Sequence, residues 1–260
     1  LAVLIYFIHH TASSIRIESL LASLADETAA TIDRLFPERL GDEEPETGGE
    51  PPDFQPGLIV RPQASGYVQS VDSSSLLRLA SEENLVINVV ARPGTFVTER
   101  DPLLRILATK APGEEKLDAQ RSTVIVGIER TPYQDLDFSI RRIVEIAQRA
   151  LSPGINDPTT ALYCIDRLRE ALVRLAERRT PSRCRHDDEG RLRIVAEPVS
   201  FEAVAVGAFG AVALYAGTDS DVLRALASAL DAVIAAAEGK DRARLLGLRR
   251  SLRQRLSDAT

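Results

Sequence analysis

The stretch at residues 130–168 constrains the fold of this chain more than any other part of its sequence. Apolar residues recur at helical spacing on both sides of the Ser-Pro-Gly run at 152–154, which predicts two helices joined by a turn. Asp157 followed by Pro158 is the usual order of an N-cap and a first helical residue. Because the stretch carries more polar side chains than such a hairpin needs, it is either a functional site or a cross-linked structural hinge.

Eight polar residues of this region form the candidate ligand-binding set. They are Arg130, Gln134, Asp135, Arg141, Glu145, Arg149, Asn156 and Asp157. Arginines near a helix N-terminus favour a small anionic ligand, although the carboxylate of Asp157 would itself occupy that end. In the alternative interpretation the turn is cap chemistry, and the residues at 141, 145 and 149 form ion pairs on the helix surface. A catalytic role would need Asp135 or Asp157 to act as a base or metal ligand beside a second carboxylate.

Composition limits the classes of protein to which the chain can belong. With 260 residues, 44% of them hydrophobic, it can form one large domain or two modest ones. A net charge of -6 argues against nucleic-acid binding, which needs a basic surface. Two cysteines, Cys164 and Cys184, fit a reducing compartment better than a disulfide framework. The serine elbow, the phosphate-binding glycine loop and the zinc-protease motif do not occur, and no metal or cofactor is expected.

The N-terminal residues 1–8 are wholly apolar but too few to cross a bilayer, which takes about 20. We interpret them as the end of a transmembrane helix, in preference to a buried helix start or an incomplete signal peptide. His9 and His10 point about 100° apart on a helix, so they do not form a metal clamp.

An apolar seam with steps of four and three follows the N-terminal run. Its residues are Ile17, Leu21, Leu24, Thr28, Thr31 and Leu35. Such a seam suits pairing with another helix or packing on the body of the protein, and it is the basis for expecting a homo-oligomer.

A small β module is predicted at residues 57–109, with a helix at 73–83 capped by Asp72 and a turn at 93–94. The order of its valine-rich strands and Pro-Gly turn resembles half of the barrel-sandwich motif of biotinyl and lipoyl domains. A carrier of that kind needs a lysine on its hairpin, and the first lysine of the chain is Lys110. We therefore expect a rigid adaptor rather than a cofactor carrier.

The C-terminal third is predicted to contain one strand, at 191–199, and three helices, at 201–216, from Asp219 or Asp221 to 237, and at 240–259. Cys184 and His186 lie in a loop at 183–190 and lack further ligands for a metal. The last helix carries seven basic and two acidic residues, so it presents either a solvated face or a surface that contacts anionic lipid headgroups or the acidic linker.

The expected architecture is α+β. It comprises a transmembrane helix end and juxtamembrane helix at 1–36, a flexible acidic linker at 37–56, the barrel-sandwich-like β module at 57–109, and a mainly helical domain at 110–260 that contains the polar hairpin.

Several short runs are similar to those of the bacterial predicted membrane protein family known as domain of unknown function 2254. The matching residues are Tyr6–His10, Ser65–Gln69, Pro93 and Gly94 with Phe96 and Val97, Gly127 with Arg130 and Thr131, Gln134 and Asp135 with Phe138, Arg149–Pro153, Asn156–Pro158, Thr160 and Ala161, and Cys164–Asp166. The resemblance implies transmembrane helices ahead of residue 1, in the bacterial inner membrane, with this chain as the soluble remainder on the cytoplasmic side. It implies no established activity and no catalytic residues.

The leading functional hypothesis is therefore a non-enzymatic domain of a multispan membrane protein, with a role in sensing, gating, transport or scaffolding. The alternative is a membrane-tethered hydrolase or transferase that uses the Asp, Arg and Asn residues at 130–157.

Overall fold

A computed structural model describes residues 2–36, 50–109, 112–237 and 242–258, with side chains from residue 17 onward. The described chain mixes helices and strands, which confirms the α+β class. It divides into two compact units. The helical unit comprises Leu1–Arg39, Leu136–Thr180 and Val199–Thr260, and the β unit comprises Leu40–Asp135 and Pro181–Pro198. The chain therefore passes between the two units four times.

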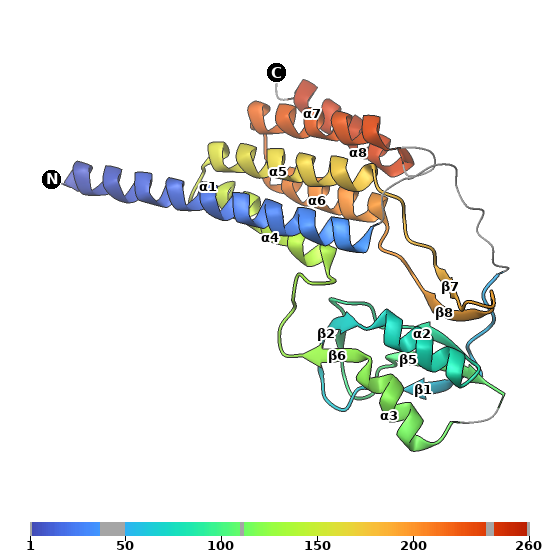
Figure 1. The fold of residues 1–260 in the computed structure, drawn as a ribbon. Helices are drawn as coiled ribbons and strands as arrows, with labels where there is room; N and C mark the ends of the chain where they lie inside the picture. Colours follow the sequence, from blue (N-terminus) through green and yellow to red (C-terminus); the bar gives the residue numbers. More distant parts are fainter. Residues whose placement is uncertain (1, 37–49, 110–111, 238–241, 259–260) are drawn as a thin grey trace. The chain divides into compact units, whose positions relative to one another are not determined.

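The helical unit is built around helix α5 (Figure 1). Its helices are α1 (Ala2–Leu35), α4 (Leu136–Ala150), α5 (Pro158–Ala176), α6 (Phe201–Tyr215), α7 (Ser220–Ala236) and α8 (Ala243–Asp258). Helix α5 packs against α1, α4 and α7, while α6 packs against α4 and α8. The predicted apolar stripe of α5 is buried, since Ile165, Leu168 and Leu172 all lie in the core.

The apolar seam of α1 is buried within the same chain, against α4 and α5. Leu21, Leu24, Thr28 and Thr31 are all buried. The hydroxyl of Thr28 donates to the Leu24 carbonyl at 2.7 Å, and a similar bond satisfies Thr31, so both threonines are accommodated in an apolar interface. Since its own chain covers this seam, the seam no longer argues for a homo-oligomer.

Ion pairs fix the position of α1 along its neighbours. Arg142 of α4 donates to both carboxylate oxygens of Glu27 at 3.0 and 3.1 Å. Arg174 in the last turn of α5 and Arg178 just after this helix both bind Asp33. These groups are partly exposed, so each pair adds little stability, about 0–1 kcal/mol. Their contribution is to favour one alignment of α1.

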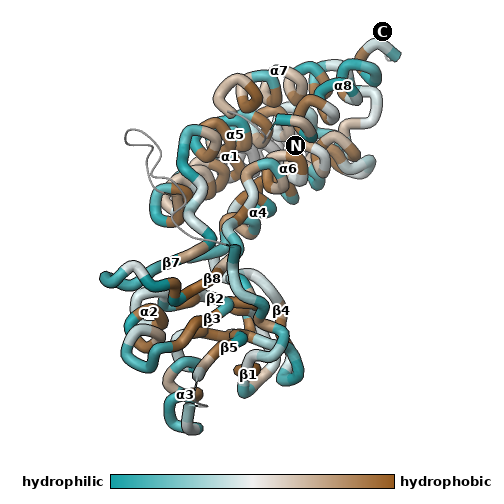
Figure 2. Tube along the Cα trace, turned by 90° about the vertical axis from the view of Figure 1, so that its right-hand side faces the viewer, coloured by the Kyte–Doolittle hydropathy of each residue, from teal (hydrophilic) through white to brown (hydrophobic). Residues whose placement is uncertain are grey.

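The β unit contains two sheets. The five-stranded sheet has the order β1 (Leu58–Val60), β5 (Leu104–Ala108), β3 (Leu85–Val89), β8 (Leu192–Ala196) and β7 (Cys184–His186). The three-stranded sheet has the order β4 (Phe96–Val97), β2 (Gly66–Val71) and β6 (Val124–Gly127). Helices α2 (Ser73–Glu82) and α3 (Glu114–Ser122) complete the unit. Hydrophobic colouring follows the inner strands β3 and β5, which supply much of its core (Figure 2).

The barrel-sandwich expectation needs correction, because the described strands form two sheets and no closed barrel. Strand β8 pairs in parallel with β3, through Ile194 opposite Ile87, although more than a hundred residues separate them. The expected solvated loop at 183–190 is likewise a strand followed by a turn, since Cys184–His186 pairs with β8. The pairing of β8 with β3 joins distant segments, which local alternation of apolar residues does not reveal, whereas β7 and β8 form a short local hairpin.

Some of the predictions for the N-terminal region concern residues outside the described part of the chain. Most of the predicted acidic linker, at 37–49, and the side chains of His9 and His10 lie outside the described residues. In the described part of the chain, no helix is both long enough and apolar enough to cross a membrane.

Candidate functional site

The eight candidate residues fall into both units. Arg130, Gln134 and Asp135 end the first segment of the β unit. The other five belong to the helical unit, on α4 and on the turn that joins α4 to α5. The predicted set therefore forms separate groups, each with its own surroundings.

The first group is organised by the carboxylate of Asp135, which is only 3% exposed. The guanidinium of Arg130 donates to its Oδ2 through Nε at 2.8 Å and through Nη2 at 2.7 Å. A buried carboxylate loses the stabilisation of water, and a two-point contact with arginine replaces part of it. Removing either partner would leave the other charge poorly solvated.

Asp135 also lies directly against a tight turn. The amide of Thr95 donates to the carbonyl of Arg92 at 3.0 Å, with Pro93 and Gly94 as the central residues. Gly94 has φ +86°, the value that the third residue of a type II turn requires and that glycine adopts without strain. A Cβ at Gly94 would overlap the Asp135 carboxylate. The turn thus requires glycine for its backbone conformation and again for the close approach of Asp135.

Gln134 holds the end of strand β2. Its Oε1 accepts from the amide of Val71 at 2.9 Å, and its Nε2 donates to the carbonyl of Val71 at 3.2 Å. Nearby, Gln69 of β2 donates to the carbonyl of Glu129 at 2.8 Å, and its side chain covers Gly127 so closely that a Cβ there would overlap it.

We call this group the Asp135 cluster. It comprises Gly66, Gln69, Gly94, Gly127, Arg130, Gln134 and Asp135. Every member lies in one of the short runs that carried the family resemblance. The cluster is a set of interlocking backbone and side-chain contacts, and it does not line the cavity described below.

The second group is the line of charges on α4. Arg141, Glu145 and Arg149 are exposed, and among the described residues no ion pair joins them. The arginine of α4 that makes a defined contact is their neighbour Arg142, which bonds Glu27 and lies over the ring of Phe138 at 5.7 Å. The expected surface ion pairs on this line are therefore absent from the described contacts, and the line is a solvated helix face.

The third group is the turn between α4 and α5, which is explained by helix capping. The Asp157 carboxylate accepts from the amide of Thr160 at 3.1 Å and from its hydroxyl at 2.6 Å, while the Asp157 amide donates to Ala150 at 2.8 Å. Asn156 is exposed at φ +47°, a conformation that asparagine tolerates. The N-terminus of α5 is thus already occupied by the chain's own carboxylate.

One of the candidate residues, Asp157, lies close to the buried cysteine Cys164. Burial, followed by the negative charge of Asp157, raises the pKa of the Cys164 thiol to about 12, so the thiol stays protonated at neutral pH. No group of three or more histidine, cysteine, aspartate or glutamate residues in the described part of the chain is placed to hold a metal ion.

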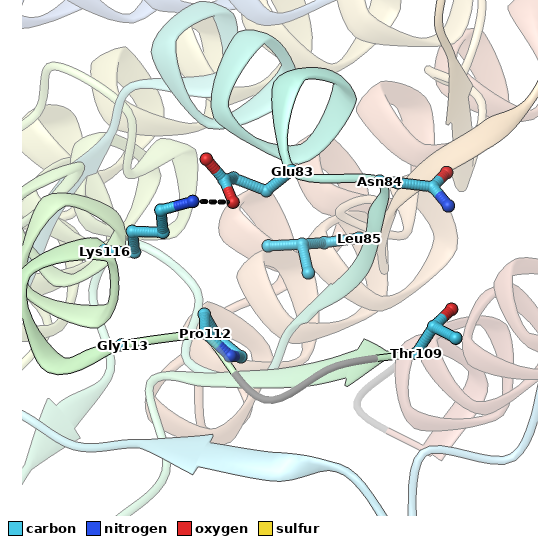
Figure 3. A pocket seen from close by; sticks show the side chains of 7 residues that line it. All are labelled: Glu83, Asn84, Leu85, Thr109, Pro112, Gly113 and Lys116. Atoms are coloured by element: carbon cyan, nitrogen blue, oxygen red, sulfur yellow. Dashed lines mark hydrogen bonds and ion pairs between the residues drawn. The ribbon is translucent and has the colours of Figure 1, made fainter.

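A cavity of about 330 Å³ lies elsewhere in the β unit, and the sequence pattern does not indicate it (Figure 3). Its lining residues are Glu83, Asn84, Leu85, Thr109, Pro112, Gly113 and Lys116. The available signal was compositional, because Lys116 is one of only three lysines in the chain.

A buried arginine supports one wall of this cavity. Arg193 of β8 is 2% exposed, and its Nη1 donates to the side chain of Asn84 at 2.9 Å and to the carbonyl of Leu85 at 3.4 Å. Its Nε donates to Asp187 at 2.7 Å. Asn84 has φ +51°, and this side-chain contact helps to hold it there.

Asp187 is the anion that balances Arg193. Desolvation alone would raise the pKa of this carboxyl, but hydrogen bonds from the Arg191 amide and from the side chains of Arg193 and Arg191 outweigh it. The pKa is lowered from 3.8 to about 2.

We expect Gly94→Ala to destabilise the protein by about 2–4 kcal/mol, because the new methyl group meets both positive-φ strain and the Asp135 carboxylate. The matched control is Gly190→Ala, also at positive φ but with open space around it, for which about 1 kcal/mol is expected. Urea unfolding measures both. Equal losses would show that the contact with Asp135 does not matter.

Asp187 should give a measurable pH dependence. A carboxyl whose pKa is lower in the folded state contributes its full stability above its ordinary pKa and loses it as the pH falls through the folded value. The contribution of Asp187 should therefore disappear between about pH 4 and pH 2. Asp187→Asn should unfold with a weaker pH dependence in this window. Titration of the carboxyl by NMR should give a pKa of about 2, and a value near 3.8 would contradict the assignment.

Comparison with known proteins places the chain in a family. The model of a family described as "Predicted membrane protein (DUF2254)" matches residues 1–232. Three mycobacterial proteins titled uncharacterized, one from Mycobacterium bovis and two from Mycobacterium tuberculosis, are each 34% identical to the chain over 239 residues. The match covers 90% of this chain but 45% of each relative, so the chain spans about half the length of these relatives. No solved structure matches the chain. The resemblance found in the sequence is thereby confirmed, and the chain belongs to the predicted membrane protein family DUF2254.

Proposed function

We propose that this chain is the water-exposed portion of a multispan bacterial membrane protein, on the cytoplasmic side of the inner membrane, and that it acts without catalysis. Its role is in sensing, gating, transport or scaffolding. The family description supports the membrane association. The greater length of the relatives leaves room for membrane segments beyond the matched part.

The observation that carries the non-catalytic part of the proposal is the engagement of both candidate carboxylates in structural bonds. Asp135 is buried against Arg130 and the turn at Gly94. Asp157 caps α5 through two bonds to Thr160. A reaction that used Asp135 or Asp157 as base or metal ligand would need that carboxylate in an accessible pocket beside a second one. Asp135 and Asp157 belong to different compact units, and neither lines the described cavity.

The topology supports a role in transmitting a signal. Strand β8 lies between β3 and β7 in the five-stranded sheet, yet it enters the sheet from a segment flanked by helices α5 and α6. Segment 181–198 therefore has both ends attached to the helical unit. The hairpin is thus linked along the chain to α5 on one side and to α6 on the other, and a covalent link of this kind suits sensing or gating.

The alternatives are less well supported. A membrane-tethered hydrolase or transferase would have to use carboxylates that already have structural partners. A small anion at the start of α5 would compete with Asp157, whose charge occupies that helix end. Association into a homo-oligomer loses its earlier basis, because the seam of α1 is covered by α4 and α5.

Substitutions at the two aspartates separate structural from catalytic roles. Asp157→Ala should cost about 1 kcal/mol, whereas Asp157→Asn should change stability by less than about 0.5 kcal/mol, because asparagine is an equally good N-cap. Asp135→Asn should cost about 2–4 kcal/mol through the loss of the buried ion pair. Urea unfolding measures all three, with exposed Arg149→Gln as a control that should change stability by less than about 0.5 kcal/mol.

The same variants test the enzyme alternative. We expect no hydrolysis of 4-nitrophenyl phosphate or 4-nitrophenyl acetate above background by the parent chain. Turnover by the parent, together with its loss in a well-folded Asp157→Asn or Asp135→Asn variant, would contradict the proposal.

The membrane association and its orientation are testable on the full-length Mycobacterium tuberculosis relative, fused at its C-terminus to green fluorescent protein or to alkaline phosphatase. We expect the fusions in the membrane fraction, with fluorescence and without phosphatase activity, because the phosphatase folds only outside the reducing cytoplasm. Recovery in the soluble fraction, or an active phosphatase, would overturn this part of the proposal.

A further inference from the structure

The cavity of the β unit lies between two helix ends of opposite polarity (Figure 3). Helix α2 ends at Glu82, with Glu83 as its C-cap. Helix α3 begins at Glu114, and its N-cap Gly113 offers no side chain to its first amides. A helix C-terminus carries a partial negative charge and an N-terminus a partial positive one. The two sides of the cavity thus differ in electrostatic character.

One charged side chain from each end reinforces this difference. Glu83 extends from the end of α2 and Lys116 from the first turn of α3, and in Figure 3 their charged groups meet beside the cavity. The side chains of Lys116 and Glu83 are 52% and 28% exposed. A pair with this exposure is worth no more than about 1 kcal/mol, so separating its two charges costs little if a ligand supplies new partners.

The remaining walls of the cavity are partly apolar. Leu85 is a buried residue of the β-unit core, and Pro112 adds a second apolar surface. Asn84 and Thr109 contribute polar groups, and Asn84 is held from behind by the buried Arg193. A volume of about 330 Å³ lies at the small end of the range of about 300–1,000 Å³ for ligand pockets, which suits a small metabolite.

The charge balance decides which small molecule fits. A singly charged ligand would separate Glu83 from Lys116 and leave one of them without a counter-charge. The exposed Glu114 and Glu115 in the first turn of α3 also oppose a purely anionic ligand. A ligand that carries an ammonium and a carboxylate close together gives both side chains a partner. Its ammonium then lies at the negative end of α2, and its carboxylate lies at the positive end of α3.

We propose that this cavity binds a small zwitterion of the α-amino acid class with an apolar side chain. Its ammonium contacts Glu83 at the end of α2, and its carboxylate contacts Lys116 at the start of α3. Its side chain packs on Leu85 and Pro112. The inference goes beyond the proposed function, which holds with or without a ligand.

Isothermal titration of the 260-residue chain with three probes of one shape tests the ligand class. The probes are L-leucine, 4-methylpentanoate, which lacks the ammonium, and 3-methylbutylamine, which lacks the carboxylate. Leucine should bind, and the two singly charged probes should bind at least about tenfold more weakly, as expected for the loss of one charged hydrogen bond. Equal binding of all three probes, or binding of none, would overturn the proposal. Neither outcome would affect the assignments of membrane location or of the Asp135 cluster.

Two variants test the site. Glu83→Gln and Lys116→Gln should each weaken leucine binding by about tenfold. The matched control is Glu82→Gln, which removes an ion pair with Arg78 on the same helix but does not line the cavity, and which should leave the affinity within about twofold. Unchanged binding in both site variants, with circular dichroism showing that they fold, would place leucine elsewhere and refute the site.

Discussion

The carboxylate of Asp135 is almost completely buried, and the groups that compensate for its burial connect several parts of the β unit. Moving a carboxylate out of water costs several kcal/mol unless another charge and further donors replace its hydration. Arg130 provides that replacement five residues earlier in the chain. Because Asp135 is the last residue before α4, this ion pair also sets where the chain leaves the β unit. The turn at Gly94 and the end of β2 at Val71 take their positions against the same two-residue segment, Gln134–Asp135.

A second constraint is the pairing of strands from distant parts of the sequence in the five-stranded sheet. Strand β3 is flanked by β5 on one side, which is close in sequence, and by β8 on the other, which is not. The buried guanidinium of Arg193 on β8 donates through Nε to Asp187 of the adjoining turn and through Nη1 to Asn84 before β3. The polar contacts thus specify the same register as the apolar pairing of Ile194 with Ile87. The distant hairpin consequently contacts one wall of the cavity, through the bonds of Arg193 to Asn84 and Leu85.

Local chemistry made much of the fold predictable. The caps at Asp72, Asp157 and Asp219 were recognisable because a helix start is encoded within four residues. The apolar stripes of α4 and α5 likewise appeared directly as helical periodicity.

Contacts between distant segments were not predictable in this way. The approach of Asp135 to Gly94 joins positions more than forty residues apart, and the pairing of β8 with β3 joins positions further apart still. Within the candidate set, the sequence identified Arg130, Gln134 and Asp135 as unusual, and the structure gives them a shared architectural role. The line from Arg141 to Arg149 was selected for its regular spacing, yet regular spacing is also what any solvated helix face shows. The cavity lay outside every predicted group, because its two charged residues come from separate helix ends.

The bonds of Gln134 have a consequence for how this protein meets other copies of itself. In an antiparallel sheet the amide and carbonyl of one residue point to the same side, so Val71 presents both groups away from β6, where β4 is too short to reach them. An uncovered backbone pair of that kind is a template onto which a foreign strand can add. The primary amide of Gln134 reproduces the donor and acceptor of a neighbouring strand at this one position. The side chain of Gln134 thus takes the place of a neighbouring strand at Val71 and keeps the backbone groups of this residue from pairing with a strand of another copy.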